Sequence, residues 1–576
     1  MKILFLNLPL RSMPDRFPPL GPTRLMDSLV DYGYTDVDFY NLDYHRPKEE
    51  AIVEYVKNCK PDIIGISAVI STSYRYLKYL SPLLRKICPN VPQIVGGNMA
   101  AAAEVMMNKM PIDLCVSGDG EETIVHLVKH YEAYGHYQDN EALRSIKGVI
   151  LRSRQEAGQL FYTEHSDKIP NNKIRQINWD IIEKSGGLDY YLPDHTTRFD
   201  FQLDPRSKDP SRGRRMGSIM TTKGCVSRCT FCHRWEKGYK ILDVDHLIEY
   251  VKMLKEKYGV GYLNCSEENF GSSIQHVEEF VQKIKPLDML WVCSGMRVKS
   301  PAVNPDTLKR MNEAGCVAIY YGMESGSDKI LTIMEKGATA ELNLRAIRLT
   351  HEANMYTTVQ LVVGMPGETR ETIEETIDFA KKAIEITANK YMMQFSINYA
   401  QALPGTPHYE YARHHGFLGK TIDDEEAYLL KTSDVDASSL RHYFNMTDAP
   451  IGEVVKWARM IRYKSMHHYR FTLRKEYNEI DQALGYVKTS RGDYLRLSPT
   501  NPLLLYASYY LEHCFYNLIS IHSLLERSDY KWKNFLKLLN DKPNIERVNK
   551  LSLRKVVNEL PSRKLSLTVQ PLREGR

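Results

Sequence analysis

The residues with the clearest capacity for chemistry are three cysteines, Cys225, Cys229 and Cys232, which are separated by three and then two residues. They follow a short apolar segment that is expected to be a strand, so the three thiols would share one tight loop. Three thiolates on such a loop can hold three irons of a [4Fe-4S] cluster and leave the fourth iron open. The alternatives are three free thiols, or half of a zinc site with His233 as a further ligand. A structural zinc site usually needs a second Cys or His pair, and none follows here.

Composition limits the class of protein. The 576 residues are enough for three domains of ordinary size. The formal net charge of +6 is small for this length and is spread along the chain, which argues against nucleic acid as a partner. The cysteines outside the loop are scattered singly, so no disulfide framework is indicated and a reducing cytoplasm is expected.

No apolar run reaches the length of a membrane span. The nearest approach, 503–525, is interrupted by Glu512, His513 and His522. The apolar start of the chain ends at Pro9 and is expected to form a buried strand, not a signal peptide.

The first 134 residues alternate short apolar runs with stretches of helical spacing, which predicts a parallel, doubly wound sheet. The expected strands are 3–6, 37–40, 63–67, 93–95 and 114–116. Small and polar residues stand at the strand ends, where such sheets bind ligands. These are Asn7, Ser71, Thr72, Gly96, Gly97, Gly118, Gly120 and Glu121.

The cysteine spacing, with Gly224 before the first thiol and Phe231 before the last, resembles the signature of the radical S-adenosylmethionine (SAM) enzymes. The Gly96-Gly97 turn and the string 118–123 placed upstream resemble the N-terminal cobalamin-binding domain of the class B members of that family. The cobalt-ligating Asp-x-His-x-x-Gly motif of many cobalamin proteins is absent, because His45 lacks the glycine and follows the second strand. The radical SAM branch commonly lacks that histidine, so the lower-face ligand of cobalt stays open.

From residue 218 the alternation resumes, after a connector in which 148–152 and 159–163 are expected to form a hairpin. Six further strands are predicted, at 218–222, 262–265, 290–294, 317–321, 357–363 and 391–396. They match the open (β/α)6 partial TIM barrel of the radical SAM core, with chemistry at the carboxyl ends of the strands.

The expected organisation is therefore α/β with three domains and a connector. A Rossmann-like cobalamin-binding domain covers 1–140, a connector covers 141–215, and the radical SAM partial barrel covers 216–415. A helical C-terminal domain, a candidate for substrate binding, covers 416–576.

The resemblance also implies SAM contacts in the barrel. Glu324 and Ser325 lie in a Gly-x-Glu-Ser-Gly string, where a carboxylate can accept hydrogen bonds from ribose hydroxyls. Gly364 opens a Gly-x-Pro-Gly-Glu-Thr string expected to pass the adenine. Ser294 and Arg297 are candidates for the SAM carboxylate, because arginine offers a bidentate fork. An interior carboxylate such as Glu324 could instead pair with a structural Arg or Lys.

The activity implied by the resemblance is that of a cobalamin-dependent radical SAM methyltransferase, which uses methylcobalamin and a 5′-deoxyadenosyl radical to methylate a carbon of a biosynthetic intermediate. The alternative is a cyclase, oxidase or rearrangement enzyme, as in anaerobic tetrapyrrole cyclisation. A non-catalytic redox or cobalamin sensor would leave the SAM strings unexplained. The implied partners are a small-molecule or peptide substrate and an electron donor such as flavodoxin or ferredoxin.

Overall fold

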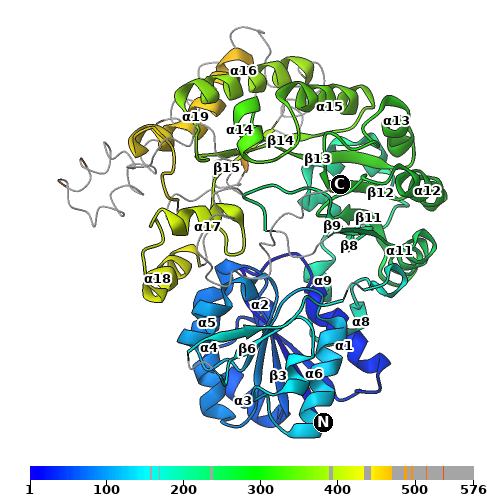
Figure 1. Cartoon of the computed structure of the whole chain (residues 1–576). Helices are drawn as coiled ribbons and strands as arrows, with labels where there is room; N and C mark the ends of the chain where they lie inside the picture. Colours follow the sequence, from blue (N-terminus) through cyan, green and yellow to red (C-terminus); the bar gives the residue numbers. More distant parts are fainter. Residues whose placement is uncertain are drawn as a thin grey trace.

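Two parallel sheets dominate the computed structural model of the chain (Figure 1). The structure describes residues 1–155, 158–167, 169–233, 238–387, 394–433 and 443–469, two short strands at 486–488 and 494–496, and positions 514, 533 and 536. None of the described helices is long and apolar enough to cross a membrane.

The N-terminal sheet has the strand order β2-β1-β3-β4-β5-β6-β7. Its strands are β1 (Ile3–Asn7), β2 (Val37–Asn41), β3 (Ile63–Ser67), β4 (Gln93–Gly96), β5 (Leu114–Val116), β6 (Val149–Arg152) and β7 (Leu160–Tyr162). Its helices are α1 (Leu20–Asp31), α2 (Leu42–His45), α3 (Glu49–Cys59), α4 (Tyr74–Ile87), α5 (Ala103–Lys109), α6 (Glu121–Tyr134) and α7 (Glu141–Arg144). The five strands expected from the sequence are confirmed as a parallel set.

Alternating apolar residues explain why helices cover both faces of this sheet. On β1, Ile3 and Phe5 belong to the apolar cluster shared with α1 and α6, whereas Leu4 and Leu6 belong to the cluster shared with α3, α4 and α5. Successive side chains of a strand point to opposite faces, so a strand that is apolar throughout must be covered twice. The sheet is therefore doubly wound, as the sequence predicts.

The expected hairpin of the connector extends this sheet. Strand β6 pairs antiparallel with β5, and β7 pairs antiparallel with β6. The segment that follows carries α8 (Trp179–Lys184), α9 (Leu188–Tyr191) and α10 (Phe199–Leu203). The first part of the connector is thus structurally part of the N-terminal domain.

The second sheet is parallel and open, with the order β15-β14-β13-β12-β11-β8. Its strands are β8 (Arg215–Ile219), β11 (Val260–Cys265), β12 (Leu290–Met296), β13 (Cys316–Glu324), β14 (Thr358–Val363) and β15 (Gln394–Tyr399). The helices between them are α11 (Val244–Tyr258), α12 (Ile274–Ile284), α13 (Pro305–Glu313), α14 (Asp328–Ile333), α15 (Ala340–Glu352) and α16 (Arg370–Thr387). This is the six-stranded partial barrel expected from the sequence.

Several strand boundaries differ from the sequence prediction, among them those of the first and sixth barrel strands. The first barrel strand ends at Ile219, and β9 (Thr222–Cys225) forms a separate antiparallel hairpin with β10 (Gly238–Ile241). The sixth strand begins at Gln394 and runs to Tyr399, later than the expected 391–396, whose first three residues lie outside the described residues. The three cysteines therefore belong to the connection of a hairpin, because Cys225 is itself paired with Gly238.

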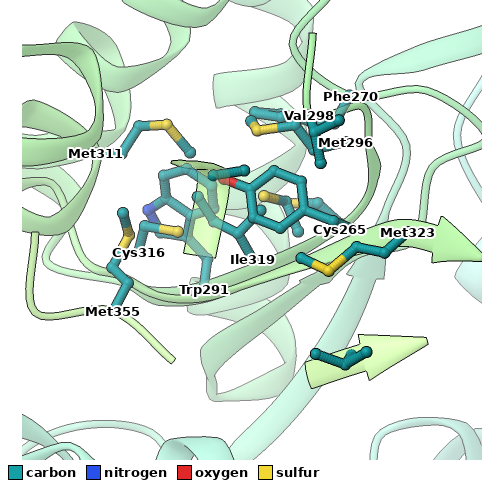
Figure 2. Packing of buried hydrophobic residues seen from close by; sticks show 14 of the residues in the cluster. Cys265, Phe270, Trp291, Met296, Val298, Met311, Cys316, Ile319, Met323 and Met355 are labelled. Atoms are coloured by element: carbon teal, nitrogen blue, oxygen red, sulfur yellow. The ribbon is translucent and has the colours of Figure 1, made fainter. Parts of the chain in front are cut away.

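The largest apolar cluster lies between the second sheet and its outer helices. Figure 2 shows Trp291 of β12 surrounded by sulfur-containing and aliphatic side chains, among them Met311 and Met355. The indole Nε1 of Trp291 donates a hydrogen bond to the carbonyl of Ala314 at 2.8 Å. On the inner face of the sheet, Phe201 of α10 packs against Tyr262 and its neighbours near the starts of the strands. Helix α10 thus closes the inside of the barrel at the end opposite to the carboxyl ends.

Three of the singly spaced cysteines meet in this core. Cys265, Cys293 and Cys316 lie on β11, β12 and β13 and are fully buried as free thiols, and Cys265 is in register with Cys293. Burial raises the pKa of the thiols of Cys265 and Cys293 well above the ordinary value. We interpret them as apolar packing groups, since a protonated buried thiol behaves as a small hydrophobe.

The chain that leaves the barrel returns to the N-terminal domain. Helices α17 (Pro407–His414) and α18 (Ile422–Thr432) descend from the barrel to α4 and α5 (Figure 1). Glu426 of α18 accepts hydrogen bonds from Tyr74 Oη at 2.9 Å and from Lys78 Nζ at 2.6 Å. The hydroxyl of Ser433 accepts from the backbone amide of Arg75 at 3.0 Å, so it caps the first turn of α4. The start of the expected C-terminal domain is therefore packed on the first domain.

Helix α19 (Ile451–His467) packs on α16 and confirms one of the expected C-terminal helices. Two short strands, β16 (Tyr486–Lys488) and β17 (Tyr494–Arg496), pair antiparallel and were not expected. The apolar stretch 503–525 lies outside the described residues apart from position 514.

Candidate functional site

The thiol loop, residues 225–232, is held from several sides. The amide of Ser227 donates to Cys225 Sγ at 3.3 Å, and the Ser227 hydroxyl lies 3.2 Å from Cys229 Sγ. The backbone of Thr230 donates to the carbonyl of Met334 at 2.9 Å and accepts from the amide of His408 at 3.0 Å. Helices α14 and α17 therefore fix the middle of the loop, and Ser227 orients two of the three sulfurs.

The surroundings of the loop raise the pKa of two of its thiols, those of Cys225 and Cys232. Burial raises the pKa of Cys225, although the Ser227 amide opposes the shift. Cys232 lies at the exposed edge of the loop, yet the protein atoms packed around its sulfur raise its pKa to about 12. Metal binding needs thiolates, so assembly of a cluster here must release protons.

The structure gives no support to a mononuclear zinc site. Within the described residues, no three His, Cys, Asp or Glu side chains converge closely enough to hold one metal ion. Burial lowers the pKa of His233 to about 4, partly opposed by the backbone of Pro404. The thiolates of a [4Fe-4S] cluster bind separate irons and do not need to converge on one ion. The arrangement fits a cluster better than zinc.

A buried ion pair lies beside the thiol loop. Glu324, at the end of β13, has φ of 65° and its carboxylate lies 3.0 Å from Lys336 Nζ. Burial by itself would lower the pKa of Lys336, but the negative charge of Glu324 and the nearby thiols of Cys229 and Cys232 outweigh it and raise the pKa. The Arg297 guanidinium donates to the Lys336 carbonyl at 2.9 Å. Two cations and one carboxylate therefore gather next to the sulfurs.

Lys336 was not found by sequence reasoning. It lies twelve residues after Glu324, beyond α14, and no motif marks it. The sequence did allow that Glu324 pairs with a structural cation, and this is the partner the structure provides. Glu324 and Arg297 keep their place at the carboxyl ends of the barrel strands.

The other expected SAM residues have local partners. The Ser294 hydroxyl donates to the Cys265 carbonyl and accepts from the amide of Glu267, both at 3.3 Å. The Ser325 hydroxyl is buried, lies 3.3 Å from Thr376 Oγ1 and accepts from the amide of Ser327 at 3.1 Å. The contacts of Ser294 fix the turn after β11, and those of Ser325 fix the turn after β13.

Glu267 ties the end of β11 to the segment that enters the thiol loop. Its carboxylate accepts hydrogen bonds from the amide of Thr221 at 2.6 Å and from the amide and hydroxyl of Thr222 at 2.9 and 2.7 Å. Burial raises the pKa of Glu267 to about 7, although these donors oppose the shift. The backbone three and four residues before Cys225 is therefore anchored by a buried carboxyl group.

The turn at Gly364 is held by hydrogen bonds to Glu368 and is packed against the ring of Tyr443. Gly364 has φ of 84°, and its amide and that of Met365 donate to the buried carboxyl of Glu368. The ring of Tyr443 lies where a Cβ on Gly364 would stand, and the Tyr443 hydroxyl donates to the Gly364 carbonyl at 3.1 Å. Glycine is required here because of both the left-handed backbone and the tyrosine.

At the strand ends of the first domain, some of the polar side chains have hydrogen-bond partners and others do not. The Asn7 amide donates to Asn41 at 3.1 Å, and Asn41 in turn donates to the Tyr191 hydroxyl at 2.9 Å. Ser71 and Thr72 form a short 3₁₀ turn before α4, and Thr72 Oγ1 is buried with no hydrogen-bond partner among the described residues. A buried polar atom without a partner is costly and points to a ligand that would satisfy it.

The two glycines after β4 have different surroundings. A Cβ on Gly97, at φ of 94°, would lie 2.4 Å from the carbonyl oxygen of Ala68, so this glycine is required by the backbone itself. A Cβ on Gly96 would meet no atom within 4 Å. Gly96 therefore leaves open space at the strand end where the sequence predicts a cofactor.

The turn after β5 is more closely packed. A Cβ on Gly118 would lie 2.3 Å from Ser166 Oγ, and one on Gly120 would lie 3.1 Å from Leu25. The Glu121 carboxylate lies 3.5 Å from Lys223 Nζ, close to the thiol loop. His45 is remote from these groups and contacts the carbonyl of Ser185 at 2.8 Å.

Family models match both halves of this arrangement. The model described as the B12 binding domain matches residues 8–128, and the model of the radical SAM superfamily matches residues 219–380. The first covers the open sheet with the unsatisfied Thr72 hydroxyl, and the second covers the partial barrel with the thiol loop.

Three known proteins are similar to this chain over roughly two thirds or more of its length. An anaerobic magnesium-protoporphyrin IX monomethyl ester cyclase of Cereibacter sphaeroides is 28% identical over 63% of this chain and 56% of its own length. An uncharacterized methyltransferase of Pyrococcus horikoshii is 29% identical over 63% of this chain and 71% of its own length. The structure of the radical SAM methyltransferase TsrM of Kitasatospora setae, with cobalamin and a [4Fe-4S] cluster bound, superposes with a TM-score of 0.53. That match has 18% identity, covers 73% of this chain and 76% of the other, and shows the fold alone.

The buried carboxyl of Glu368 predicts a pH-dependent stability. Burial raises its pKa from 4.5 to about 8, so the folded state keeps a proton that the unfolded chain releases near pH 4.5. The stability it contributes is complete below that value and is lost as the pH rises through about 8, by at most about 1.4 kcal/mol per pH unit. Between about pH 6 and about pH 9, the midpoint of thermal unfolding should fall further for the native sequence than for Glu368→Gln.

The matched control is Glu352→Gln, since Glu352 is an exposed carboxylate on α15. Its unfolding midpoint should follow that of the native sequence at every pH. Parallel pH profiles for Glu368→Gln and the native sequence would contradict the assignment.

Proposed function

We propose, from the premise that this chain belongs to the cobalamin-dependent radical SAM enzymes, that it is a methyltransferase acting on a carbon centre of a biosynthetic intermediate. Its cofactors are a [4Fe-4S] cluster, SAM and cobalamin. The observation that carries the proposal is the direct contact between the strand-end turn of the first domain and the hairpin of the thiol loop, through Glu121 and Lys223. A corrinoid at the first site and SAM at the second would share one reaction space.

When bound, the cluster supplies the electron that cleaves SAM, and cobalamin carries the methyl group. The chain's own residues hold and position these groups. Cys225, Cys229 and Cys232 hold three irons, and Ser227 supports two of the sulfurs by hydrogen bonds. The loop is anchored at its entry by Glu267 through Thr221 and Thr222.

Charge around the sulfurs suits the polar parts of SAM. Lys336 and Arg297 provide positive charge for the SAM carboxylate, and Glu324 keeps Lys336 protonated and offers acceptors to the ribose hydroxyls. Ser294, Ser325 and Gly364 shape the turns around that space. Buried ammonium and carboxylate groups are retained here in spite of their desolvation cost, as is typical of a binding site.

The corrinoid is held at the carboxyl ends of the first sheet. Thr72 supplies the unsatisfied hydroxyl, and Gly96 leaves room for a bulky ring. The remaining contacts that we assign to this site are Asn7, Ser71, Gly97, Gly118, Gly120 and Glu121. A small-molecule or peptide substrate and an electron donor such as flavodoxin or ferredoxin complete the reaction, in a reducing cytoplasm.

A second candidate is a cyclase, oxidase or rearrangement enzyme on the same scaffold. The similarity to the anaerobic magnesium-protoporphyrin cyclase favours it, since that protein is as similar in sequence as the methyltransferase relative. Both reactions would use the same cluster and the same first domain. They differ in whether the methyl group of SAM is consumed.

The first test concerns the cluster. Replacing Cys225, Cys229 and Cys232 together by alanine should reduce the iron and sulfide content of anaerobically reconstituted protein to background, because no thiolates remain on the loop. Iron analysis and Mössbauer spectra measure this. The control Cys88→Ala removes a half-buried thiol outside the loop and should keep the full cluster. A full cluster in the triple variant would overturn the assignment.

The second test concerns the corrinoid. Gly96→Leu should abolish retention of hydroxocobalamin on desalting, because the side chain fills the open space beside the strand end, whereas Gly96→Ala should weaken retention less. Absorbance of the bound corrinoid is the measurement. The iron content of both variants should stay at the native level, which shows that the barrel is intact. Native retention in Gly96→Leu would place the corrinoid elsewhere.

The third test decides the reaction type. Methyl transfer with radical activation should produce S-adenosylhomocysteine and 5′-deoxyadenosine in about equal amounts per product, because one SAM donates its methyl group and another is cleaved. Chromatography of the reaction mixture measures both. A cyclase or oxidase would give 5′-deoxyadenosine without stoichiometric S-adenosylhomocysteine, and that outcome would replace the methyltransferase by the second candidate.

A further inference from the structure

A buried carboxylate of the first domain binds two lysines of the thiol-loop hairpin. Asp119 lies in the turn between β5 and α6, and its two oxygens take different partners. Oδ1 lies 2.6 Å from Lys223 Nζ on β9, and Oδ2 lies 2.7 Å from Lys240 Nζ on β10. Asp119 and Lys240 are 8% and 7% exposed, so these contacts are shielded from solvent.

The two lysines stand directly opposite each other on the hairpin. Lys223 is in register with Lys240 across the antiparallel pair β9–β10. Like charges at opposed positions of a strand pair repel each other and destabilise the pairing. Asp119 lies between the two ammonium groups, and Glu121 contributes a second carboxylate 3.5 Å from Lys223. The hairpin therefore depends on carboxylates that belong to another domain.

A buried arrangement of this kind is weak evidence for stability. Desolvation of ammonium and carboxylate groups offsets most of their attraction, so apolar side chains of similar volume would serve stability equally well. The ion pairs instead fix the position of the hairpin relative to the first domain, since each hydrogen bond has a defined length and direction. Lys223 lies two residues before Cys225, and Cys225 itself ends the strand. The position of the first cluster thiol is thus tied to the turn after β5.

We propose that Asp119 is a positioning residue that sets the separation between the [4Fe-4S] cluster and the corrinoid by clamping Lys223 and Lys240. This inference rests on the proposed function, because it assumes a corrinoid at the strand ends of the first domain. Asp119 acts through the two lysines, because each of its carboxylate oxygens lies against one of them. Its loss should leave the thiols and the corrinoid contacts in place but release the hairpin that sets their separation.

The test uses full-length Asp119→Asn loaded with cluster and hydroxocobalamin. Iron and corrinoid contents should match the native protein, and dithionite-driven cleavage of SAM to 5′-deoxyadenosine should stay within about twofold. In a separate assay the corrinoid is first reduced to cob(I)alamin with titanium(III) citrate, and it then takes the methyl group of SAM with release of S-adenosylhomocysteine. The rate of this transfer should fall by about 10- to 100-fold, since a displacement of about 1 Å costs that much in oriented reactions. The control is Asp245→Asn. Asp245 lies on α11 and forms an exposed ion pair with Lys283 of α12, so its replacement should change none of these values.

A second variant separates positioning from folding. Asp119→Asn combined with Lys240→Met removes the opposed charge and leaves Lys223 with Glu121, so the midpoint of thermal unfolding should recover towards the native value. Methyl transfer to the corrinoid should remain low, because both contacts of Asp119 are still absent and only the longer contact of Lys223 with Glu121 joins the hairpin to the first domain. Recovery of transfer together with stability would overturn the positioning role, as would a native rate in Asp119→Asn.

A spectroscopic readout does not depend on the reaction. The reduced cluster should speed the relaxation of the cob(II)alamin electron paramagnetic resonance signal in the native protein, and this enhancement should change in Asp119→Asn because it depends on separation. An unchanged enhancement would overturn the clamp. If the native protein shows the enhancement but transfers no methyl group, the proposed function fails while the clamp is still tested by the spectrum.

Discussion

Parallel sheets bind ligands at one end of their strands only, because loops and helix N-termini gather at the carboxyl ends. This chain contains two such sheets, and a reaction that uses both edges requires them to face each other at a fixed separation. The contacts of Asp119 and Glu121 with Lys223 and Lys240 join the turn after β5 to the hairpin after β8. The placement of the thiol loop, of the SAM space beside it and of the first-domain strand ends depends on this join.

Buried carboxyl groups recur wherever a loop of the site has to be held. Glu267 binds the amides that lead into the thiol loop, Glu368 binds those of the Gly364 turn, and Glu324 pairs with Lys336. In the first two, burial raises the pKa to about 7 and about 8, so both carboxyl groups change their charge near neutral pH. Groups of this kind specify a single loop geometry at some cost in solvation.

A second connection between the two domains runs through α17 and α18, and α18 packs on α4 and α5 of the first domain. Glu426 and Ser433 bind the first turn of α4, which directly follows Ser71 and Thr72. A segment that leaves the barrel therefore supports a loop of the first domain. Each domain therefore holds residues that fix a loop of the other.

The sequence by itself determined the two sheets, the six-stranded open barrel and the thiol loop. Local patterns carry these features, since alternation of apolar residues reports strands and helices, and the cysteine spacing reports a loop with three ligands. The expected strands at 63–67 and 114–116 agree to the residue. The hairpin β9–β10, the return of α18 and the partners Lys336, Lys240 and Tyr443 followed only from the tertiary structure. Each of these depends on contacts between residues far apart in the chain, such as Asp119 with Lys240 or Gly364 with Tyr443, and no local spacing encodes such a contact.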